Sequence, residues 1–186
     1  MKYVIASDIH GSSFYGNQLI DRYWAEEADR LILLGDLYYH GPRNPLPVEY
    51  DPQKLIERLN QLKDRIIAIQ GNCDSEIDKT VSEFEFHDTH TRNLCGYNVT
   101  LTHGHSYNIT TPPLLRGDIL LYGHYHIASI KVLGNGVVVA NPGSISLPKN
   151  NSPHAYLVLT SNELVLKSLL SGDVIDMLSL PIGSRN

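Results

Sequence analysis

The fold of this 186-residue chain is constrained most strongly by short apolar runs, each of which leads into a polar cluster beside a glycine. In the first half these runs are residues 2–7, which lead into Asp8, residues 31–34, which lead into Asp36, and residues 65–69, which lead into Asn72. Short apolar runs that end at such clusters are typical of buried strands. Apolar residues at helical spacing over residues 15–24 separate the first two runs, which predicts a β-α-β unit.

The second half is predicted to be rich in strands and almost free of helices. Before it, still in the first half, a proline-bearing loop over residues 37–51 follows the second run. A helix is then expected to begin with Asp51 as its N-cap and Pro52 at its first position. The later strand candidates are residues 97–102, 118–122, 127–133, 136–140, 155–159 and 164–169. Two β-layers covered by helices would bury these runs, so we expect one α/β domain over residues 1–186.

Composition narrows the possible function classes. A hydrophobic content of 42% is enough for a core, and a net charge of -5 lacks the basic field by which proteins hold nucleic acids. The two cysteines, Cys73 and Cys95, have no Cys-x-x-Cys spacing and suit a reducing compartment. The first residues turn polar too early for a signal peptide, and no apolar run is long enough to span a bilayer. We therefore expect a cytoplasmic protein with no membrane or stable nucleic-acid partner.

The chemically active side chains gather at the predicted strand ends. They are Asp8 and His10, Asp36, Asn72 with Cys73 and Asp74, His103 and His105, and His124 and His126. Open α/β sheets place binding sites beyond the carboxyl ends of their strands, so these clusters can converge. Residues two apart in an extended segment share one face at roughly 6 to 7 Å, so each such pair could serve two neighbouring metals. Carboxylate and imidazole without thiolate suit manganese, iron or zinc.

Each cluster alone also has an ordinary structural interpretation. A lone Asp-x-His or His-x-His pair is more often a turn or a solvated loop, and Gly-Asn-x-Asp is also common turn chemistry. The occurrence of five such clusters in one order carries the functional interpretation. The histidines His40, His87, His90 and His154 lie outside this order, and we expect them to be structural or exposed.

The ordered clusters resemble those of the calcineurin-like metallophosphoesterases, and within them the small bacterial phosphodiesterases of the YfcE type. The narrower resemblance is carried by Ser7-Asp8-Ile9-His10-Gly11, His40-Gly41-Pro42-Arg43-Asn44, Gly71-Asn72-Cys73-Asp74-Ser75 and Asn141-Pro142-Gly143-Ser144. It covers residues 1 to about 150. It implies an α/β fold in which a two-sheet β-sandwich is flanked by helices in four αββα layers, with a dinuclear metal site at the strand ends.

The resemblance also implies a role for each matching position. It assigns Asp8, His10 and His126 to one metal ion, Asn72, His103 and His124 to the other, and Asp36 to both as a bridging carboxylate. The expected cofactors are two divalent ions, with manganese favoured over iron, nickel or zinc. Two such ions can activate a water to hydroxide and clamp the phosphoryl oxygens during its attack, which predicts hydrolysis of a small-molecule phosphodiester.

Further residues are candidates around this centre. Asn72 can also contact the phosphate, and Arg43 on the loop beside Asp36 can donate to a phosphate oxygen. His105 is a candidate for lining the substrate pocket or supporting a metal ligand, and Asp74 for orienting its loop. The walls of that pocket are expected in residues 37–51 and 106–116. The strand-rich surface is also compatible with assembly into a homo-oligomer.

Cys73 departs from the wider family, in which a histidine often follows the asparagine and assists the leaving group. A thiol is a weak hydrogen-bond donor, so general-acid assistance worth about 10²- to 10⁴-fold in rate would be missing. We therefore expect phosphodiesters with activated aryl leaving groups to be the best substrates and alkyl phosphomonoesters to be poor ones. The alternative is that Cys73 is only a small residue beneath the metals.

Three other function classes share part of this pattern. A non-catalytic scaffold, like the retromer subunit related to these enzymes, would be expected to have lost ligand positions, and here none is missing. A repair-type nuclease would carry extra domains and a DNA-binding surface. The short length of this chain and its net negative charge argue against that function. A dinucleoside polyphosphate hydrolase would need a nucleobase pocket, which the sequence does not reveal.

Overall fold

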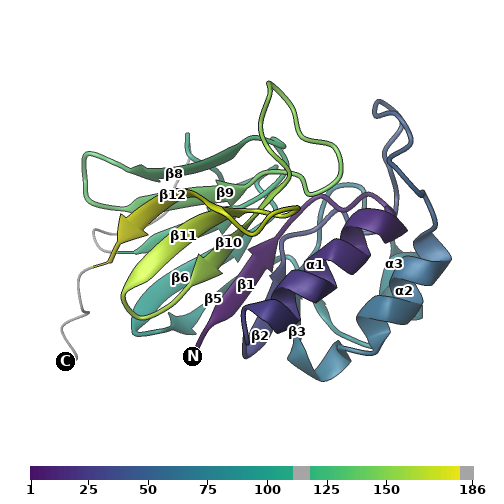
Figure 1. Cartoon of the computed structure of the whole chain (residues 1–186), viewed down its shortest axis with the longest axis horizontal. Helices are drawn as coiled ribbons and strands as arrows, with labels where there is room; N and C mark the ends of the chain where they lie inside the picture. Colours follow the sequence, from purple (N-terminus) through teal and green to yellow (C-terminus); the bar gives the residue numbers. More distant parts are fainter. Residues whose placement is uncertain (111–117, 181–186) are drawn as a thin grey trace.

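The computed structural model describes residues 1–110 and 118–180, which form two facing β-sheets with helices beside the larger sheet (Figure 1). The larger sheet has the strand order β12 (Val174–Ser179), β11 (Glu163–Ser168), β10 (Ala155–Leu159), β1 (Tyr3–Ala6), β2 (Arg30–Leu33), β3 (Ile66–Ile69) and β4 (Phe86–His87). The smaller sheet has the order β5 (Thr89–Leu94), β6 (Tyr97–Thr102), β7 (Ile119–Tyr122), β9 (Val138–Pro142) and β8 (Ala128–Val132). The helices are α1 (Ser13–Ala25), α2 (Pro52–Asn60), the 3-10 helix η1 (Lys63–Arg65) and α3 (Glu76–Val81).

Both sheets contain a group of parallel strands. In the larger sheet β1, β2 and β3 run parallel, with Leu31 opposite Val4 on one side and Ile66 on the other. In the smaller sheet β6, β7 and β9 run parallel in the same manner. Because parallel strands end at the same edge of a sheet, the polar clusters that follow them are brought to that edge.

The larger sheet is covered by an apolar core on each of its two faces. Val4 and Ala6 on β1 belong to the core that includes residues of α1 and α2, whereas Tyr3 and Ile5 belong to the core shared with the smaller sheet. A strand that is buried on both faces reads as a continuous apolar run, which explains the pattern at residues 2–7. A third apolar cluster, which includes Leu120, lies on the opposite face of the smaller sheet. Packing on both faces fixes the strand ends that carry the site.

The helix starts follow local capping chemistry. The side chain of Asp51 accepts a hydrogen bond of 3.1 Å from the backbone N of Lys54, and Pro52 occupies the first turn of α2, as predicted. The side chain of Ser12 caps α1 in the same way, at 3.2 Å from the backbone N of Tyr15. The two capped helices connect the parallel strands: α1 lies between β1 and β2, and α2 lies between β2 and β3.

The sequence interpretation missed the short helix α3 and the strands β4, β5 and β12. β5 exposes most of its side chains and β4 has only two residues, so neither has the apolar pattern of a buried strand. β12 contains Val174, Ile175, Met177 and Leu178, but they do not alternate with polar residues and the first three are exposed. α3 is a six-residue helix in which Asp78 is the only buried residue. None of the helices within residues 1–110 and 118–180 has the length and apolar character needed to cross a membrane.

Candidate metal centre

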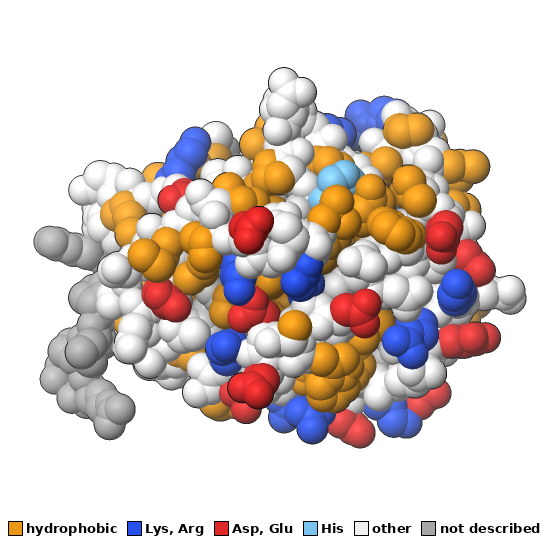
Figure 2. Space-filling model, viewed as in Figure 1, with side chains coloured by type: hydrophobic (Ala, Val, Ile, Leu, Met, Phe, Trp, Pro, Cys, Tyr) orange, Lys and Arg blue, Asp and Glu red, His pale blue; other side chains and the backbone are white. Residues whose placement is uncertain are grey.

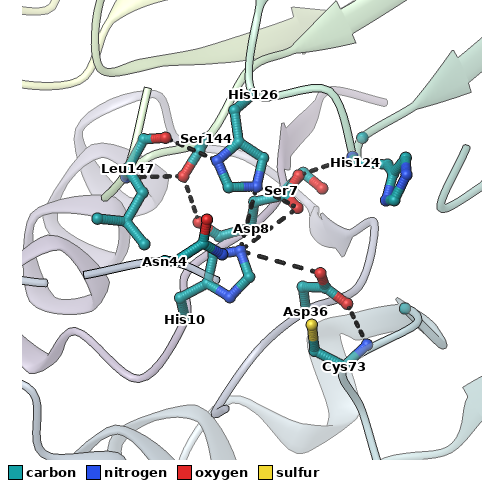
Figure 3. Close-up of polar contacts among 12 residues, drawn as sticks. Ser7, Asp8, His10, Asp36, Asn44, Cys73, His124, His126, Ser144 and Leu147 are labelled. Atoms are coloured by element: carbon teal, nitrogen blue, oxygen red, sulfur yellow. Dashed lines mark hydrogen bonds and ion pairs between the residues drawn. The ribbon is translucent and has the colours of Figure 1, made fainter. Parts of the chain in front are cut away.

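The predicted ligands converge where the strand ends of the two sheets meet (Figure 3). We call Asp8, His10 and His126 the inner group, and Asn72, His103 and His124 the outer group. Asp36 lies between the two groups. Asp8 and His10 follow β1 and Asp36 follows β2, whereas His103 follows β6 and His126 follows β7. The site therefore combines both sheets, and neither sheet could form it alone.

The inner group is almost completely buried. His126 Nε2 lies 3.2 Å from Asp8 Oδ1 and 3.2 Å from His10 Nε2, and His10 Nε2 lies 3.7 Å from Asp8 Oδ1. Each ring is oriented through its other nitrogen: His10 Nδ1 lies 2.8 Å from the carbonyl of Tyr39, and His126 Nδ1 lies 2.6 Å from that of Leu147. Carbonyl contacts of this kind leave both Nε2 atoms free to bind a metal.

Asp36 connects the inner and outer groups. Its Oδ2 lies 3.9 Å from His10 Nε2 and 3.4 Å from His103 Nε2. Its Oδ1 accepts a hydrogen bond of 2.8 Å from the backbone N of Cys73. One carboxylate oxygen is thus held by the backbone while the other faces both groups, which is the arrangement that a bridging ligand requires.

The outer group is more open. His103 is buried, with Nδ1 2.7 Å from the carbonyl of Leu34 and Nε2 3.0 Å from Asn72 Oδ1. Asn72 is exposed and His124 is half-buried. The His124 ring lies 5.1 Å from the His103 ring, and its backbone N donates a hydrogen bond of 2.9 Å to Asp8 Oδ2. Among the described residues, His124 is not part of any set of acidic, histidine or cysteine ligand atoms within 4.8 Å of one another.

The other predicted site residues take supporting or peripheral positions. Asp74 accepts hydrogen bonds from the backbone N atoms of Asp36 (2.8 Å), Leu37 (2.8 Å) and Gly71 (2.7 Å), and so ties the Asp36 loop to the Asn72 loop. Burial raises the pKa of Asp74 to about 6, although these three hydrogen bonds favour its ionised form. His105 is exposed, with its ring 5.6 Å from that of His103.

Arg43 and Cys73 face a cavity that opens onto the centre. This cavity has a volume of about 740 Å³, and Asp36, Asn72, His124 and His126 also line it. Within the predicted wall over residues 37–51, Tyr39 and residues 41–44 line this cavity. A second cavity of about 550 Å³ on the other side of Asn72 is lined by His105, Ser106 and Tyr107, whereas residues 111–116 of that predicted wall lie outside the described residues.

Most of the candidate ligands have an unusual backbone conformation. Positive φ values occur at Asp8 (56°), His10 (51°), Asp36 (56°), His124 (69°) and His126 (60°). Residues other than glycine rarely adopt this left-handed region, and strain of this kind persists where surrounding contacts enforce it and is concentrated at functional sites. Here the left-handed conformation directs the side chains of these residues toward the candidate metal centre.

Two glycines allow the carboxylates to approach the backbone closely. A Cβ on Gly71 would lie 2.1 Å from Asp36 Oδ1, and a Cβ on Gly123 would lie 1.9 Å from Ser7 Oγ and 2.8 Å from Asp8 Oδ2. Neither position could accept a side chain unless an acidic residue of the site moved. The glycines beside the clusters are therefore explained by close approach.

The charges of the site already favour a bound cation. Burial alone would raise the pKa of Asp8, but the neighbouring His126 ring and the charge of His103 lower it, and contacts with His103 likewise lower the pKa of Asp36. Burial would lower the pKa of His103, but its hydrogen bond to Asp36 and the charges of both carboxylates raise it to about 9. Two buried carboxylates thus hold positive charge nearby, here a proton on His103.

The donor set fits divalent metal ions. Asp8 Oδ1 is buried and, within the described part of the chain, receives no hydrogen bond of good geometry, although His126 Nε2 lies 3.2 Å away. A buried carboxylate oxygen without a donor is costly, and a metal ion would satisfy it. The surrounding oxygen and imidazole donors suit manganese, iron, nickel or zinc.

Several supporting residues were not predicted. Ser144 Oγ donates a hydrogen bond of 2.6 Å to the carbonyl of Asp8, and Asn141 Nδ2 donates one of 2.8 Å to the carbonyl of Gly123. Both residues belong to the sequence Asn141-Pro142-Gly143-Ser144, which the family resemblance had singled out without a role. The carbonyls of Tyr39 and Leu147 have no signal in the sequence, because any residue carries a carbonyl.

Comparison with known proteins places the chain in a family. The model of the calcineurin-like phosphoesterase superfamily domain matches residues 1–163. The chain is 36% identical over 182 residues to phosphodiesterase YfcE of Escherichia coli (strain K12), covering 97% of this chain and 98% of YfcE. It is 29% identical over 168 residues to the probable metallophosphoesterase YsnB of Bacillus subtilis (strain 168), covering 86% and 84%. The chain therefore belongs to the calcineurin-like phosphoesterase superfamily.

Solved structures agree with this assignment. The structure of YfcE, a phosphoesterase from E. coli, matches with a TM-score of 0.93 over 97% of this chain and 100% of that chain, at 36% identity. Vps29 of Chaetomium thermophilum matches with a TM-score of 0.61 over 96% and 95% at only 11% identity, which shows the fold alone. The predicted family and two-sheet fold are confirmed, and the family relationship implies divalent metal ions, for which the structure provides candidate ligand groups.

Proposed function

We propose that this protein is a metal-dependent phosphodiesterase that uses two divalent ions, with manganese as the native metal, to hydrolyse a small-molecule phosphodiester. The observation that carries the proposal is the position of Asp36 Oδ2, 3.9 Å from His10 Nε2 and 3.4 Å from His103 Nε2. A carboxylate that faces two ligand groups at once fits a shared ligand of two ions. The E. coli relative YfcE, which is named a phosphodiesterase, supports the reaction class.

Each residue has a defined task in this proposal. Asp8, His10 and His126 bind one ion, Asn72, His103 and His124 bind the second, and Asp36 binds both. When bound, the two ions supply Lewis acidity that activates a water and neutralises charge on the phosphoryl group. Asp74 holds the Asp36 and Asn72 loops together through its three backbone hydrogen bonds. The exposed amide of Asn72 lies on the cavity wall, where it can also contact a phosphate oxygen.

Cys73 restricts the leaving group in this proposal. Its Sγ is half-buried beside the centre, and burial together with the Asp36 carboxylate raises the pKa of the thiol to about 12. A neutral thiol is a weak hydrogen-bond donor and gives a departing alkoxide little help. Diesters with good leaving groups, such as aryl diesters, are therefore the expected substrates, and alkyl phosphomonoesters should react slowly.

The scaffold alternative is disfavoured because the candidate ligands are retained, converge and are held in strained conformations. A nucleic-acid substrate is disfavoured by the net charge of -5. On the face in Figure 2, acidic and basic side chains are interspersed and form no continuous basic field. A cytoplasmic location and assembly into a homo-oligomer belong to the proposal as well, on the grounds given by the sequence.

The test is turnover of bis(p-nitrophenyl) phosphate beside p-nitrophenyl phosphate, with protein freed of metal and then loaded with manganese, iron, nickel or zinc. We expect metal-dependent cleavage of the diester, little cleavage of the monoester, and a loss of at least about 10³-fold in Asp36→Asn because a neutral amide with one oxygen cannot replace a carboxylate shared by two ions. Asp21→Asn, which changes an exposed aspartate on α1, is the matched control. No turnover with any metal would refute the proposal, and a clear monoesterase preference would refute its diester part.

A further inference from the structure

The cavity beside the metal centre is larger than a phosphate group needs. Its volume of about 740 Å³ is in the range that holds a whole small-molecule ligand. The candidate metal ligands line only one part of it. Arg43, Lys149, Tyr39 and Tyr125 line other parts, and none of these four is needed to bind the ions.

Lys149 is fixed relative to the centre by its backbone. Its N donates a hydrogen bond of 3.0 Å to the carbonyl of His126, and its carbonyl accepts one of 2.9 Å from the N of Ser152. Two residues earlier, the carbonyl of Leu147 contacts His126 Nδ1. The segment that orients a metal ligand therefore also carries an exposed cation into the cavity.

Arg43 lies on the loop whose backbone orients the other histidine of the inner group. The carbonyl of Tyr39 orients His10, and the chain then turns at Gly41 to Asn44, where the Asn44 side chain bonds the carbonyl of His40 at 2.9 Å. Arg43 is exposed within this turn. Neither Arg43 nor Lys149 forms an ion pair within the described residues, and among the described residues that line the cavity Asp36 is the only carboxylate.

Two tyrosines give the cavity aromatic surface. Tyr39 is 42% exposed and Tyr125 is 43% exposed, and both residues line the cavity. Partly exposed tyrosine rings are suited to stacking against a planar ring system. The cavity therefore combines unpaired positive charge with aromatic surface beyond the metal ligands.

We propose, on the basis of the phosphodiesterase function above, that this part of the cavity binds a nucleotide arm of the phosphodiester, with its base against Tyr39 and Tyr125 and its second phosphate at Arg43 and Lys149. Stacking supplies affinity for a planar base, and the two cations select an arm that carries negative charge. The substrate class is thus a diester in which one alcohol component is itself a nucleotide.

The test compares three diesters that release the same p-nitrophenolate from manganese-loaded protein and differ only in the other arm. The arms are phenyl, thymidine joined through its 5′-oxygen, and the same thymidine with a 3′-phosphate. We expect kcat/KM to rise at each step, with the 3′-phosphate contributing about three- to tenfold, as partly exposed ion pairs do. Calorimetric Kd values for thymidine 5′-phosphate and thymidine 3′,5′-bisphosphate give a second readout that does not depend on turnover.

Variants assign the effect to the proposed residues. Lys149→Ala with Arg43→Ala should remove the preference for the 3′-phosphate in both readouts, and Lys149→Arg should keep it. Tyr125→Leu should reduce the preference for thymidine over phenyl. Lys131→Ala removes an exposed cation on β8 that lies outside this cavity and should change neither ratio.

The outcomes separate this proposal from the function on which it rests. Cleavage of the phenyl diester with no gain from the 3′-phosphate would overturn the nucleotide arm and leave the phosphodiesterase intact. If no diester is cleaved but thymidine 3′,5′-bisphosphate still binds more tightly than thymidine 5′-phosphate in a manner that depends on Lys149, the proposed binding site is supported and the phosphodiesterase function is refuted. A preference that survives in the double variant would also overturn the assignment.

Discussion

The inner and outer ligand groups differ in how firmly the protein holds them. Asp8, His10 and His126 are at most 2% exposed, and both histidine rings are oriented by backbone carbonyls. In the outer group only His103 is held in this way, while Asn72 is exposed and His124 is half-buried. The same kinds of ligand are thus preorganised on one side of Asp36 and adaptable on the other.

This difference has a consequence for metal binding. Ligands that are already oriented lose little conformational freedom when an ion binds, so the inner group should bind its ion more tightly. The outer group lies partly on the cavity wall, because Asn72 and His124 line it. The second ion should therefore bind more weakly, exchange faster and lie next to the substrate.

The largest expected effect comes from removing one histidine from each group. His126→Ala should abolish the tighter of two manganese-binding steps and lower kcat/KM by about 10³-fold or more, because the inner ion loses a buried ligand. His124→Ala should leave the tighter step intact and weaken the second by about 10- to 100-fold. Calorimetric titration of metal-free protein measures both steps.

His90→Ala is the matched control, since His90 lies on β5 outside every candidate ligand group found in the described residues. A thermal melt of each variant separates loss of metal from loss of fold. If His124→Ala removed the tighter step while His126→Ala spared it, the proposed order of the two groups would be reversed.

A smaller effect is expected from displacing the carboxylate between the groups. In Gly71→Ala the new Cβ would lie 2.1 Å from Asp36 Oδ1, so Asp36 must move away from one or both groups. A displacement of about 1 Å at a reacting centre costs about 10²-fold in rate, and we expect a loss of that size in diester turnover. Gly134→Ala, where no atom lies within 4 Å of the new Cβ, should leave turnover unchanged. Full activity in Gly71→Ala would mean that the position of Asp36 is not critical.

Most of the fold could be predicted from the sequence because its central strands are buried on both faces. Runs such as residues 2–7 and 31–34 have one interpretation, and Asp51 with Pro52 marks a helix start. The edge strand β5 carries no such signal, because its side chains are mostly polar and exposed. The edge strand β12 contains four apolar residues, but they do not alternate with polar ones and so do not match a half-buried strand. Each of them pairs with the strand next to it in the sequence, β5 with β6 and β12 with β11.

The candidate site was predictable in its side chains but not in its support. Asp8, Asp36 and the histidines follow strand ends, and the order of the clusters identifies the family. These side chains are oriented by the carbonyls of Tyr39 and Leu147 and by positive φ values. Neither feature can be recognised from residue type, because every residue has a carbonyl and the φ values occur at residues other than glycine. Lys149 was missed for the same reason, because only the folded chain brings it beside His126.

The smallest expected effect concerns Cys73, whose backbone follows the outer ligand Asn72 while its Sγ lies within 4.8 Å of ligand atoms of His10 and Asp36. Since the thiol stays neutral, an imidazole at this position would add a proton donor beside the departing oxygen. Cys73→His should therefore raise turnover of a dialkyl phosphodiester, in which both possible leaving groups are poor, by about tenfold relative to bis(p-nitrophenyl) phosphate. Cys73→Ser keeps a small neutral group and should give no such gain. Equal gains on good and poor leaving groups would show that Cys73 fills space beneath the metals and sets no specificity.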